Sequence, residues 1–167
     1  MMVGNMSKIA KTQIGITDTA ILAVLVSFLA ITNTSGRVLG GLMSDKIGRV
    51  NALFVVFALQ MLNMACFALY QNLPALIAGI ILVGFCYGTL LSVFPSITAD
   101  LYGLKNYGTN YGVLYLGWGL AGVVAPIAAD IIYDANGSFG VAYIVAAVMM
   151  GLMVCVNALF RKASQGR

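Results

Sequence analysis

The fold is decided by ten residues, Gly41-Leu42-Met43-Ser44-Asp45-Lys46-Ile47-Gly48-Arg49-Val50, which lie between two long apolar stretches. They hold three charged residues and two glycines, although charged residues make up only 8% of the chain. A charged connection this short between two apolar helices belongs at a membrane surface, where its charges reach water and its glycines let the backbones approach closely. The segment therefore predicts two membrane-spanning helices that turn back on one another.

Composition extends this interpretation to the whole chain. Of its 167 residues, 61% are hydrophobic and five are acidic, which is too little charge to cover a soluble domain of this size. No basic block with interleaved aromatic residues occurs, so nucleic-acid binding is not indicated. Stretches of about 20 apolar helical residues are long enough to cross a bilayer. The prediction is an all-α, polytopic membrane protein forming one partial bundle over 1–167, with spans at about 19–43, 51–70, 73–94, 107–132 and 139–160.

Glycine marks the places where these helices are expected to pack. Gly36 and Gly40 in the first span are four residues apart, as are Gly84 and Gly88 in the third, a spacing that permits close helix crossing. The first seventeen residues have apolar positions at helical spacing and are interpreted as the end of a further helix. A bent, tightly packed fourth span is predicted by Gly112, Gly117, Gly119, Gly122 and Pro126.

The basic residues outside the spans indicate the orientation. Six of them fall on one side of the membrane and two on the other, and the positive-inside rule makes the first side cytoplasmic. The chain is thus expected to cross the cell membrane (plasma or inner) several times, with its C-terminus in the cytoplasm. The cytoplasmic set is Lys46, Arg49, Lys105, Arg161, Lys162 and Arg167, and the opposite set is Lys8 and Lys11.

Several motifs resemble those of a known family. Residues 33–49 resemble the eighth helix and following loop of the oxalate/formate antiporter group, and residues 94–103 and 106–112 resemble its tenth-to-eleventh region. The resemblance implies the end of helix seven and helices eight to twelve, the C-terminal half of such a transporter, without its N-terminal half. The loop signature of the wider major facilitator superfamily is matched by Gly41, Asp45, Lys46, Gly48 and Arg49.

The resemblance also implies a function. A transporter of this kind moves a small organic anion by alternating access, as an antiporter or a proton symporter. Its partners would be that anion, the lipid bilayer and the missing N-terminal half, and the 167-residue chain alone is expected to be inactive. The alternative class is a small helical membrane scaffold or assembly partner that does not transport.

Arg37 is the expected substrate-binding residue. It lies eight residues before Asp45, which at 1.5 Å per residue is roughly 12 Å inside the cytoplasmic boundary. An unpaired guanidinium near the midplane costs about 3 kcal/mol or more, and a substrate carboxylate can compensate it with two parallel hydrogen bonds. Asn33, one helical turn earlier, is expected to add a polar contact. Two alternatives stay open: the side chain extends to the cytoplasm, or it pairs with a residue of the other half.

An aromatic stripe is expected to line the same cavity. Tyr111, Tyr115 and Trp118 recur on one face of the fourth span, although a core or interfacial stripe is the alternative interpretation, above all for Tyr111. Oxalate-carrying relatives place a lysine in the corresponding helix, whereas residues 107–132 contain no Lys or Arg. A single intramembrane cation balances one negative charge, so we expect a monocarboxylate such as lactate or formate rather than oxalate.

The charged residues of the loop signature have a separate expected role. By the resemblance, Asp45 belongs to a gate that faces the N-terminal half, and Arg49 is expected to contact Asp100 at the end of the third span. The alternative is a plain positively charged loop. Asp130, near the far end of the fourth span, is interpreted as a solvated helix end rather than as a proton site.

Enzymatic chemistry is not indicated. The chain has no histidine, no paired intramembrane aspartates, and no Ser or Cys beside a base, so no catalytic residue is predicted. Cys66, Cys86 and Cys155 lie singly in apolar segments and are interpreted as helix-core residues. No metal site and no cofactor are expected.

Overall fold

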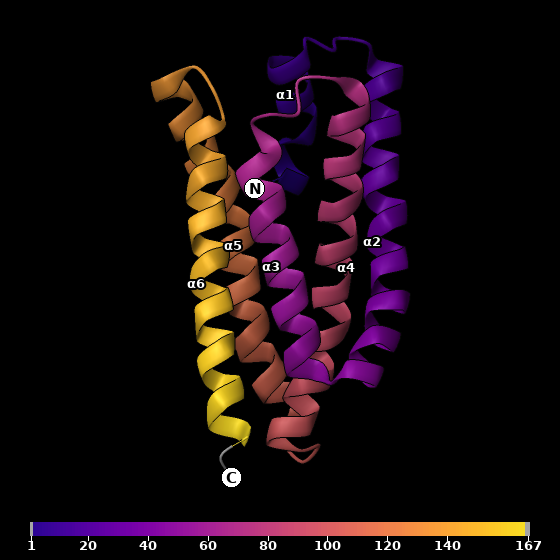
Figure 1. Cartoon of the computed structure of the whole chain (residues 1–167), viewed down its shortest axis with the longest axis vertical. Coiled ribbons are helices and arrows are strands. Elements are labelled where there is room, and N and C mark those ends of the chain that lie inside the picture. Colours follow the sequence, from indigo (N-terminus) through magenta and orange to yellow (C-terminus); the bar gives the residue numbers. More distant parts are fainter. Residues whose placement is uncertain (1, 166–167) are drawn as a thin grey trace.

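The computed structural model describes residues 2–165, and every regular element within them is an α-helix. Five of the six helices, all except α1, are long and apolar enough to cross a membrane. The predicted all-α, multi-span architecture is thus confirmed (Figure 1). The helices are α1 (Met2–Ile14), α2 (Thr19–Ile47), α3 (Arg49–Phe67), α4 (Leu73–Tyr102), α5 (Tyr107–Asn136) and α6 (Gly140–Gln165).

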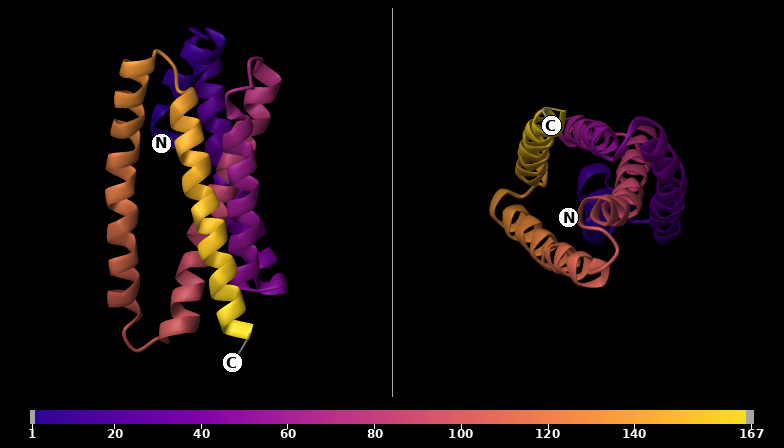
Figure 2. Two further views of the ribbon diagram at one scale, coloured as in Figure 1. Left: turned by 60° about the vertical axis from the view of Figure 1, so that its left-hand side comes forward. Right: turned by 90° about the horizontal axis from the view of Figure 1, so that it is seen from below.

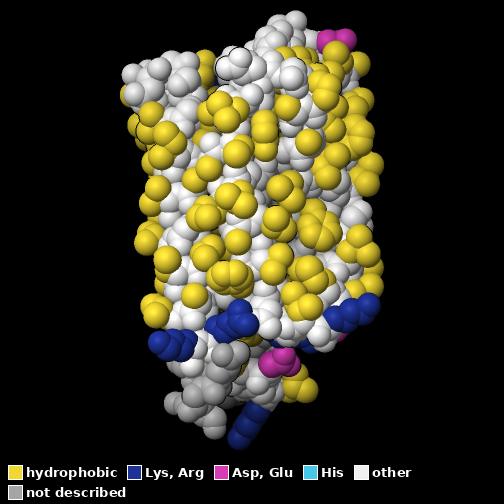
Figure 3. Space-filling view, in the orientation of Figure 1, with side chains coloured by type: hydrophobic (Ala, Val, Ile, Leu, Met, Phe, Trp, Pro, Cys, Tyr) yellow, Lys and Arg dark blue, Asp and Glu magenta, His cyan; other side chains and the backbone are white. Residues whose placement is uncertain are grey.

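The helices run side by side along the long axis of the molecule (Figure 1). The α2–α3 and α4–α5 connections and the end of α6 lie together at one end. Lys and Arg side chains gather there, beside a flank that is mostly apolar (Figure 3), and we call it the basic end. The α1–α2, α3–α4 and α5–α6 connections lie at the opposite end. The fold therefore separates the two sets of connections as the sequence predicts.

Four helices, α2, α4, α5 and α6, end beyond their predicted spans, and α2 and α4 show the reason. The segment quoted above is not a loop: α2 continues through it to Ile47, and the chain turns at Gly48 alone. Gly48 has φ 88°, a conformation that glycine adopts without strain, and its N–H donates to the Ser44 carbonyl at 3.0 Å. Likewise α4 runs through Pro95 to Tyr102. Lipid offers backbone groups no hydrogen-bond partner, so helices persist up to the membrane surface even across a proline.

The closest helix pair is α2 with α4, and four glycines make it possible. A Cβ added to Gly36 would overlap the Phe85 carbonyl of α4, and one added to Gly88 would overlap the Asn33 carbonyl of α2. Thr89 is fully buried at the crossing and donates a hydrogen bond of 3.2 Å to the Gly36 carbonyl. The predicted crossing at these glycines is confirmed. Added Cβ atoms on the other two glycines would also overlap their neighbours, the Thr89 side chain at Gly40 and the Thr32 hydroxyl at Gly84.

Helix α1 packs into the end of the bundle opposite the basic end. Ile9 is completely buried in the main hydrophobic cluster, so the helical spacing seen in the first residues is confirmed. The Gln13 amide donates to the Phe67 and Tyr70 carbonyls at 2.7 and 2.9 Å, which pairs two groups at the end of α3. Its oxygen accepts a hydrogen bond of 2.9 Å from the Tyr143 hydroxyl of α6. Burial raises the pKa of Tyr70, whose hydroxyl lies 3.2 Å from the Asn63 side-chain oxygen.

Helix α5 is loosely packed, contrary to the expectation from its glycines. It stands at the edge of the bundle (Figure 2), and Ala129 is its one buried residue. A Cβ added to Gly112 or Gly117 would meet nothing within 4 Å, and the same holds for Gly119 and Gly122. The prediction of a tightly packed fourth span is therefore wrong within residues 2–165. A glycine allows another helix to approach closely, but it does not determine whether a helix lies there.

Candidate functional site

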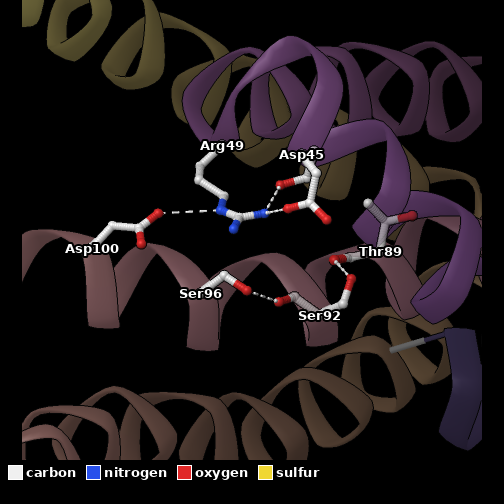
Figure 4. A network of polar contacts seen from close by, with 7 residues as sticks. Asp45, Arg49, Thr89, Ser92, Ser96 and Asp100 are labelled. Atoms are coloured by element: carbon white, nitrogen blue, oxygen red, sulfur yellow. Dashed lines mark hydrogen bonds and ion pairs between the residues drawn. The ribbon is translucent and has the colours of Figure 1, made fainter. Parts of the chain in front are cut away.

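A charged network lies at the basic end (Figure 4). Arg49, the first residue of α3, donates from Nε to Asp100 Oδ2 of α4 at 3.2 Å and pairs through Nη1 with Asp45 of α2. The same Nη1 lies 2.9 Å from the Ser44 hydroxyl, and Ser44 is 1% exposed. One guanidinium thus connects the ends of three helices. The predicted contact between Arg49 and Asp100 is confirmed.

The other residues of the loop signature surround this network. Gly41 is half-buried in α2, and a Cβ there would lie 3.7 Å from the Ser92 hydroxyl of α4. Gly48 forms the turn itself, and the Lys46 side chain is exposed beside it. The Asp45 side chain is 59% exposed although it is paired with Arg49. The arrangement leaves Asp45 accessible from outside this bundle.

We expect only weak energetic coupling between Arg49 and Asp100. The Asp100 side chain is 57% exposed, and exposed ion pairs are typically worth about 0.5 kcal/mol. A double-mutant cycle with Arg49→Gln and Asp100→Asn, measured by thermal unfolding in detergent, should give about that coupling. A second cycle that pairs Arg49→Gln with Asp134→Asn, at the opposite end of the bundle, should give none. Equal coupling in the two cycles would contradict the observed network.

Arg37 lies on α2 at the level of the α2–α4 crossing. A Cβ added to Gly88 of α4 would be 3.0 Å from the Arg37 backbone nitrogen. The Arg37 side chain is exposed, and its Nε donates to Asn33 Oδ1 at 3.2 Å. Within residues 2–165 this is its one side-chain hydrogen bond, and it forms no ion pair. Arg37 and Asn33 thus meet on one face of α2, and the terminal guanidinium nitrogens form no hydrogen bond within the described residues.

The predicted aromatic stripe is a continuous row on α5. From Tyr107 through Tyr111 and Tyr115 to Trp118, neighbouring ring centroids lie 5.6, 4.9 and 6.2 Å apart. Tyr87 of α4 extends the row, because its ring centroid is 5.2 Å from that of Trp118. These distances are typical of attractive aromatic pairs. The row therefore passes from α5 to α4.

Tyr87 is the residue that relates the aromatic row to Arg37. It precedes Gly88, where an added Cβ would overlap the Asn33 carbonyl and lie 3.0 Å from the Arg37 backbone nitrogen, so Arg37 lies beside the turn of α4 that carries the aromatic partner of Trp118. Within residues 2–165 no cation–π contact joins Arg37 to any of these rings. Arg37 on α2 and Trp118 on α5 thus both lie near this turn of α4, whereas α2 and α5 do not contact each other within these residues.

Two features of the structure were not predicted from the sequence. Tyr87 carries no motif of its own, and only its place beside Gly88 in a glycine-spaced helix indicates a position at a helix crossing. Asp130 is not simply a solvated helix end, since its carboxylate forms an ion pair of 2.6 Å with Lys8 of α1. Lys8 and Asp130 are far apart in sequence, and no local pattern links them.

In the part of the chain that the structure describes, no group of three or more His, Cys, Asp or Glu side chains is placed to hold a metal. A cavity of about 230 Å³ lies at the end opposite the basic end. None of the predicted site residues lines it; its walls are Thr12, Gln13, Ala68, Gly137, Ser138, Phe139, Gly140 and Tyr143.

Comparison with known proteins identifies the family. The model of the Major Facilitator Superfamily matches residues 1–166. The chain therefore belongs to the Major Facilitator Superfamily and is a multi-pass membrane protein. The relatives found in this family are transporters, not enzymes.

Three relatives show the range of the similarity. YhjX of Escherichia coli strain K12, described as an uncharacterized MFS-type transporter, is 35% identical over 107 residues, or 64% of this chain. The oxalate:formate antiporter of Oxalobacter formigenes is 32% identical over 97 residues, or 57% of the chain. Monocarboxylate transporter 12 of Rattus norvegicus is 25% identical over 132 residues, or 77% of the chain. The matched regions cover 27%, 23% and 27% of these relatives, so the chain spans roughly a quarter of their length.

Proposed function

We propose that this chain is the C-terminal half of a transporter that carries a small organic anion across the cell membrane by alternating access, as an antiporter or a proton symporter. Membership of the superfamily supports transport. The loop signature at the α2–α3 turn supports the placement, with α1 as the end of helix seven and α2–α6 as helices eight to twelve. The positive-inside rule favours a cytoplasmic basic end, and hence a cytoplasmic C-terminus.

Arg37 is the observation that carries the choice of an anion. It lies about eight residues, or roughly 12 Å, along α2 from Asp45, which is near the midplane of a bilayer. Its Nε is occupied by a neutral partner, Asn33, so its charge is not balanced within the described chain. The two terminal nitrogens can donate parallel hydrogen bonds to one carboxylate. A bound organic anion therefore supplies the charge that this position lacks.

The surroundings of Arg37 favour a singly charged substrate. Residues 107–132 of α5 contain no Lys or Arg, so a second carboxylate would find no cation in that part of α5. Tyr87, Tyr115 and Trp118 instead offer ring faces and a few hydrogen-bond donors for the apolar part of a small monocarboxylate such as lactate or formate. Tyr111, further along the row, extends this lining. The names of two relatives, an oxalate:formate antiporter and a monocarboxylate transporter, fit this substrate class.

The network at the basic end is proposed to be a gate. Arg49 holds α2, α3 and α4 together, while the exposed carboxylate of Asp45 remains able to meet a helix end of the N-terminal half. Gly41, Lys46 and Gly48 place these charges at the turn. Closing of the cytoplasmic end would bring the two halves together there, and opening would separate them.

Uptake measurements test the proposed substrate class. Proteoliposomes that contain the full-length transporter are expected to take up labelled lactate or formate about 10-fold faster than oxalate, since an unbalanced charge costs at least ~1.4 kcal/mol. Liposomes with the 167-residue chain alone should show no saturable uptake, because alternating access needs a second bundle.

Three outcomes would contradict these expectations. Preferred uptake of oxalate would overturn the single-charge argument. Saturable uptake by the 167-residue chain would overturn the need for a second half. Failure of the full-length protein to move any organic anion would favour the alternative of a membrane scaffold.

A further inference from the structure

A second charged cluster lies at the end of the bundle opposite the basic end. Lys8 of α1 and Asp130 of α5 form an ion pair with Nζ and Oδ1 2.6 Å apart. The Lys8 ammonium also lies 4.7 Å from the ring centroid of Tyr133 and 5.8 Å from that of Phe139. A cation over aromatic faces and beside a carboxylate is held from several directions. The cluster joins α1 to α5 and to the start of α6.

A neighbouring contact reinforces this junction. Asn5, one turn before Lys8 on α1, is only 9% exposed, and its amide donates to the Pro126 carbonyl of α5 at 3.3 Å. Ala129, the one buried residue of α5, is adjacent to Asp130. The part of α5 after Pro126 is thus fixed to α1 by an ion pair, a hydrogen bond and apolar burial.

The part of α5 before Pro126 is held differently. It contains the glycines at which an added Cβ would meet nothing within 4 Å. Within residues 2–165 its one aromatic contact with another helix is that between Trp118 and Tyr87. Pro126 has no N–H and cannot donate to the Gly122 carbonyl. One backbone hydrogen bond of α5 is therefore missing at the border between the two parts. The direction of the part before Pro126 is therefore set from two ends, by its connection to α4 and by how firmly the part after Pro126 is fixed.

We propose that Lys8 and Asp130 are a positioning pair: by fixing the Pro126–Asn136 segment to α1, they help to set the place of the aromatic row beside α4, the helix that also packs against Arg37. Neither residue touches the proposed substrate position. The placement of α5 by this pair is independent of the proposed function, whereas its effect on substrate binding rests on that function. The two consequences are measured separately.

Trp118 reports on the placement directly, because it is the single tryptophan of the 167-residue chain. In the purified chain, Lys8→Gln or Asp130→Asn should change the quenching of Trp118 fluorescence by acrylamide about twofold, because each removes a partly exposed ion pair, whose typical contribution shifts a conformational equilibrium by about that factor. Exchanging the charges, with Lys8→Asp and Asp130→Lys together, should recover part of the change, because the ion pair returns while the cation over the Tyr133 and Phe139 rings does not. Lys11→Gln is the matched control, since Lys11 is an exposed cation one turn further along α1, and it should leave quenching unchanged.

Transport provides the second measurement. In the full-length transporter, the single variants should raise KM for the transported monocarboxylate about twofold with a smaller change in kcat, and the charge exchange should recover part of that change. Unchanged Trp118 quenching in both single variants, or an exchange variant that recovers none of the change, would overturn the positioning pair. If a single variant does not fold, the exchange variant decides, since a folded protein supports the pair and failure to fold refutes it.

The two proposals can fail separately. A Trp118 response with no change in KM would overturn the effect on substrate binding. A Trp118 response in a protein that moves no organic anion would overturn the proposed function and leave the positioning pair supported.

Discussion

Replacement of Arg37 by glutamine is expected to lower kcat/KM for monocarboxylate uptake by the full-length transporter about 100-fold or more. Two charge-assisted hydrogen bonds contribute about 1.5 kcal/mol or more each, and their loss together accounts for this factor. The effect should be large because Asn33, the one side-chain partner of Arg37 in residues 2–165, is neutral and cannot take over binding of the carboxylate. Initial uptake rates over a range of substrate concentrations measure it.

Two further variants separate charge from shape. Arg37→Lys keeps the charge but loses the planar pair of donors, so uptake should be intermediate between those of the wild type and Arg37→Gln. Thr34→Val is a matched control on α2, since the Thr34 hydroxyl is exposed and bonds only to the Ala30 carbonyl of its own helix. Full activity of a correctly folded Arg37→Gln protein would contradict the proposed substrate site.

The largest effect on stability is expected from Gly88→Ala. The added methyl group would overlap the Asn33 carbonyl of α2, and a backbone atom cannot rotate away as a side chain can. Helices α2 and α4 must then separate, which also weakens the hydrogen bond between Thr89 and the Gly36 carbonyl. We expect the free energy of unfolding to fall by about 3 kcal/mol. Thermal unfolding of the purified chain in detergent measures the loss.

Gly112→Ala is the matched control. Gly112 also lies inside a membrane helix, but a Cβ there meets nothing within 4 Å. Alanine favours the helix by about 0.5–1 kcal/mol over glycine, so this variant should be as stable as the wild type or more stable. Equal destabilisation by both substitutions would contradict the close α2–α4 crossing.

Features with a short repeat along the chain were predictable from the sequence. The apolar spans, the glycine pairs of α2 and α4, and the aromatic row of α5 all follow from helical periodicity. Contact between Arg49 and Asp100 was also predictable, because both residues end spans on the same side of the membrane and carry opposite charges. The helix boundaries were harder to predict from the sequence, since α2 and α4 continue through residues that favour turns in water.

Contacts between distant segments were not predictable. Lys8 and Asp130 are 122 residues apart, and Tyr87 meets Trp118 only because α4 and α5 pack where they do. The glycines of α5 gave the opposite error, since their spacing indicated a tightly packed helix and no neighbouring helix approaches them within residues 2–165. A single sequence records which contacts a helix face permits, and the arrangement of the neighbouring helices decides which are made.

By itself the sequence determined that the chain lies in a membrane as a series of apolar helices with its charges sorted to the two ends, because the cost of placing charge and unpaired backbone in lipid acts on every residue separately. Only the tertiary structure decided which helix touches which. The Gly36–Gly88 crossing, the level of Arg37 beside Tyr87 and the Lys8–Asp130 pair all depend on side chains and backbones that meet across long separations in the chain. Lipid is as apolar as the helix faces, so packing and specific polar contacts, not hydrophobic pattern, select among the possible arrangements.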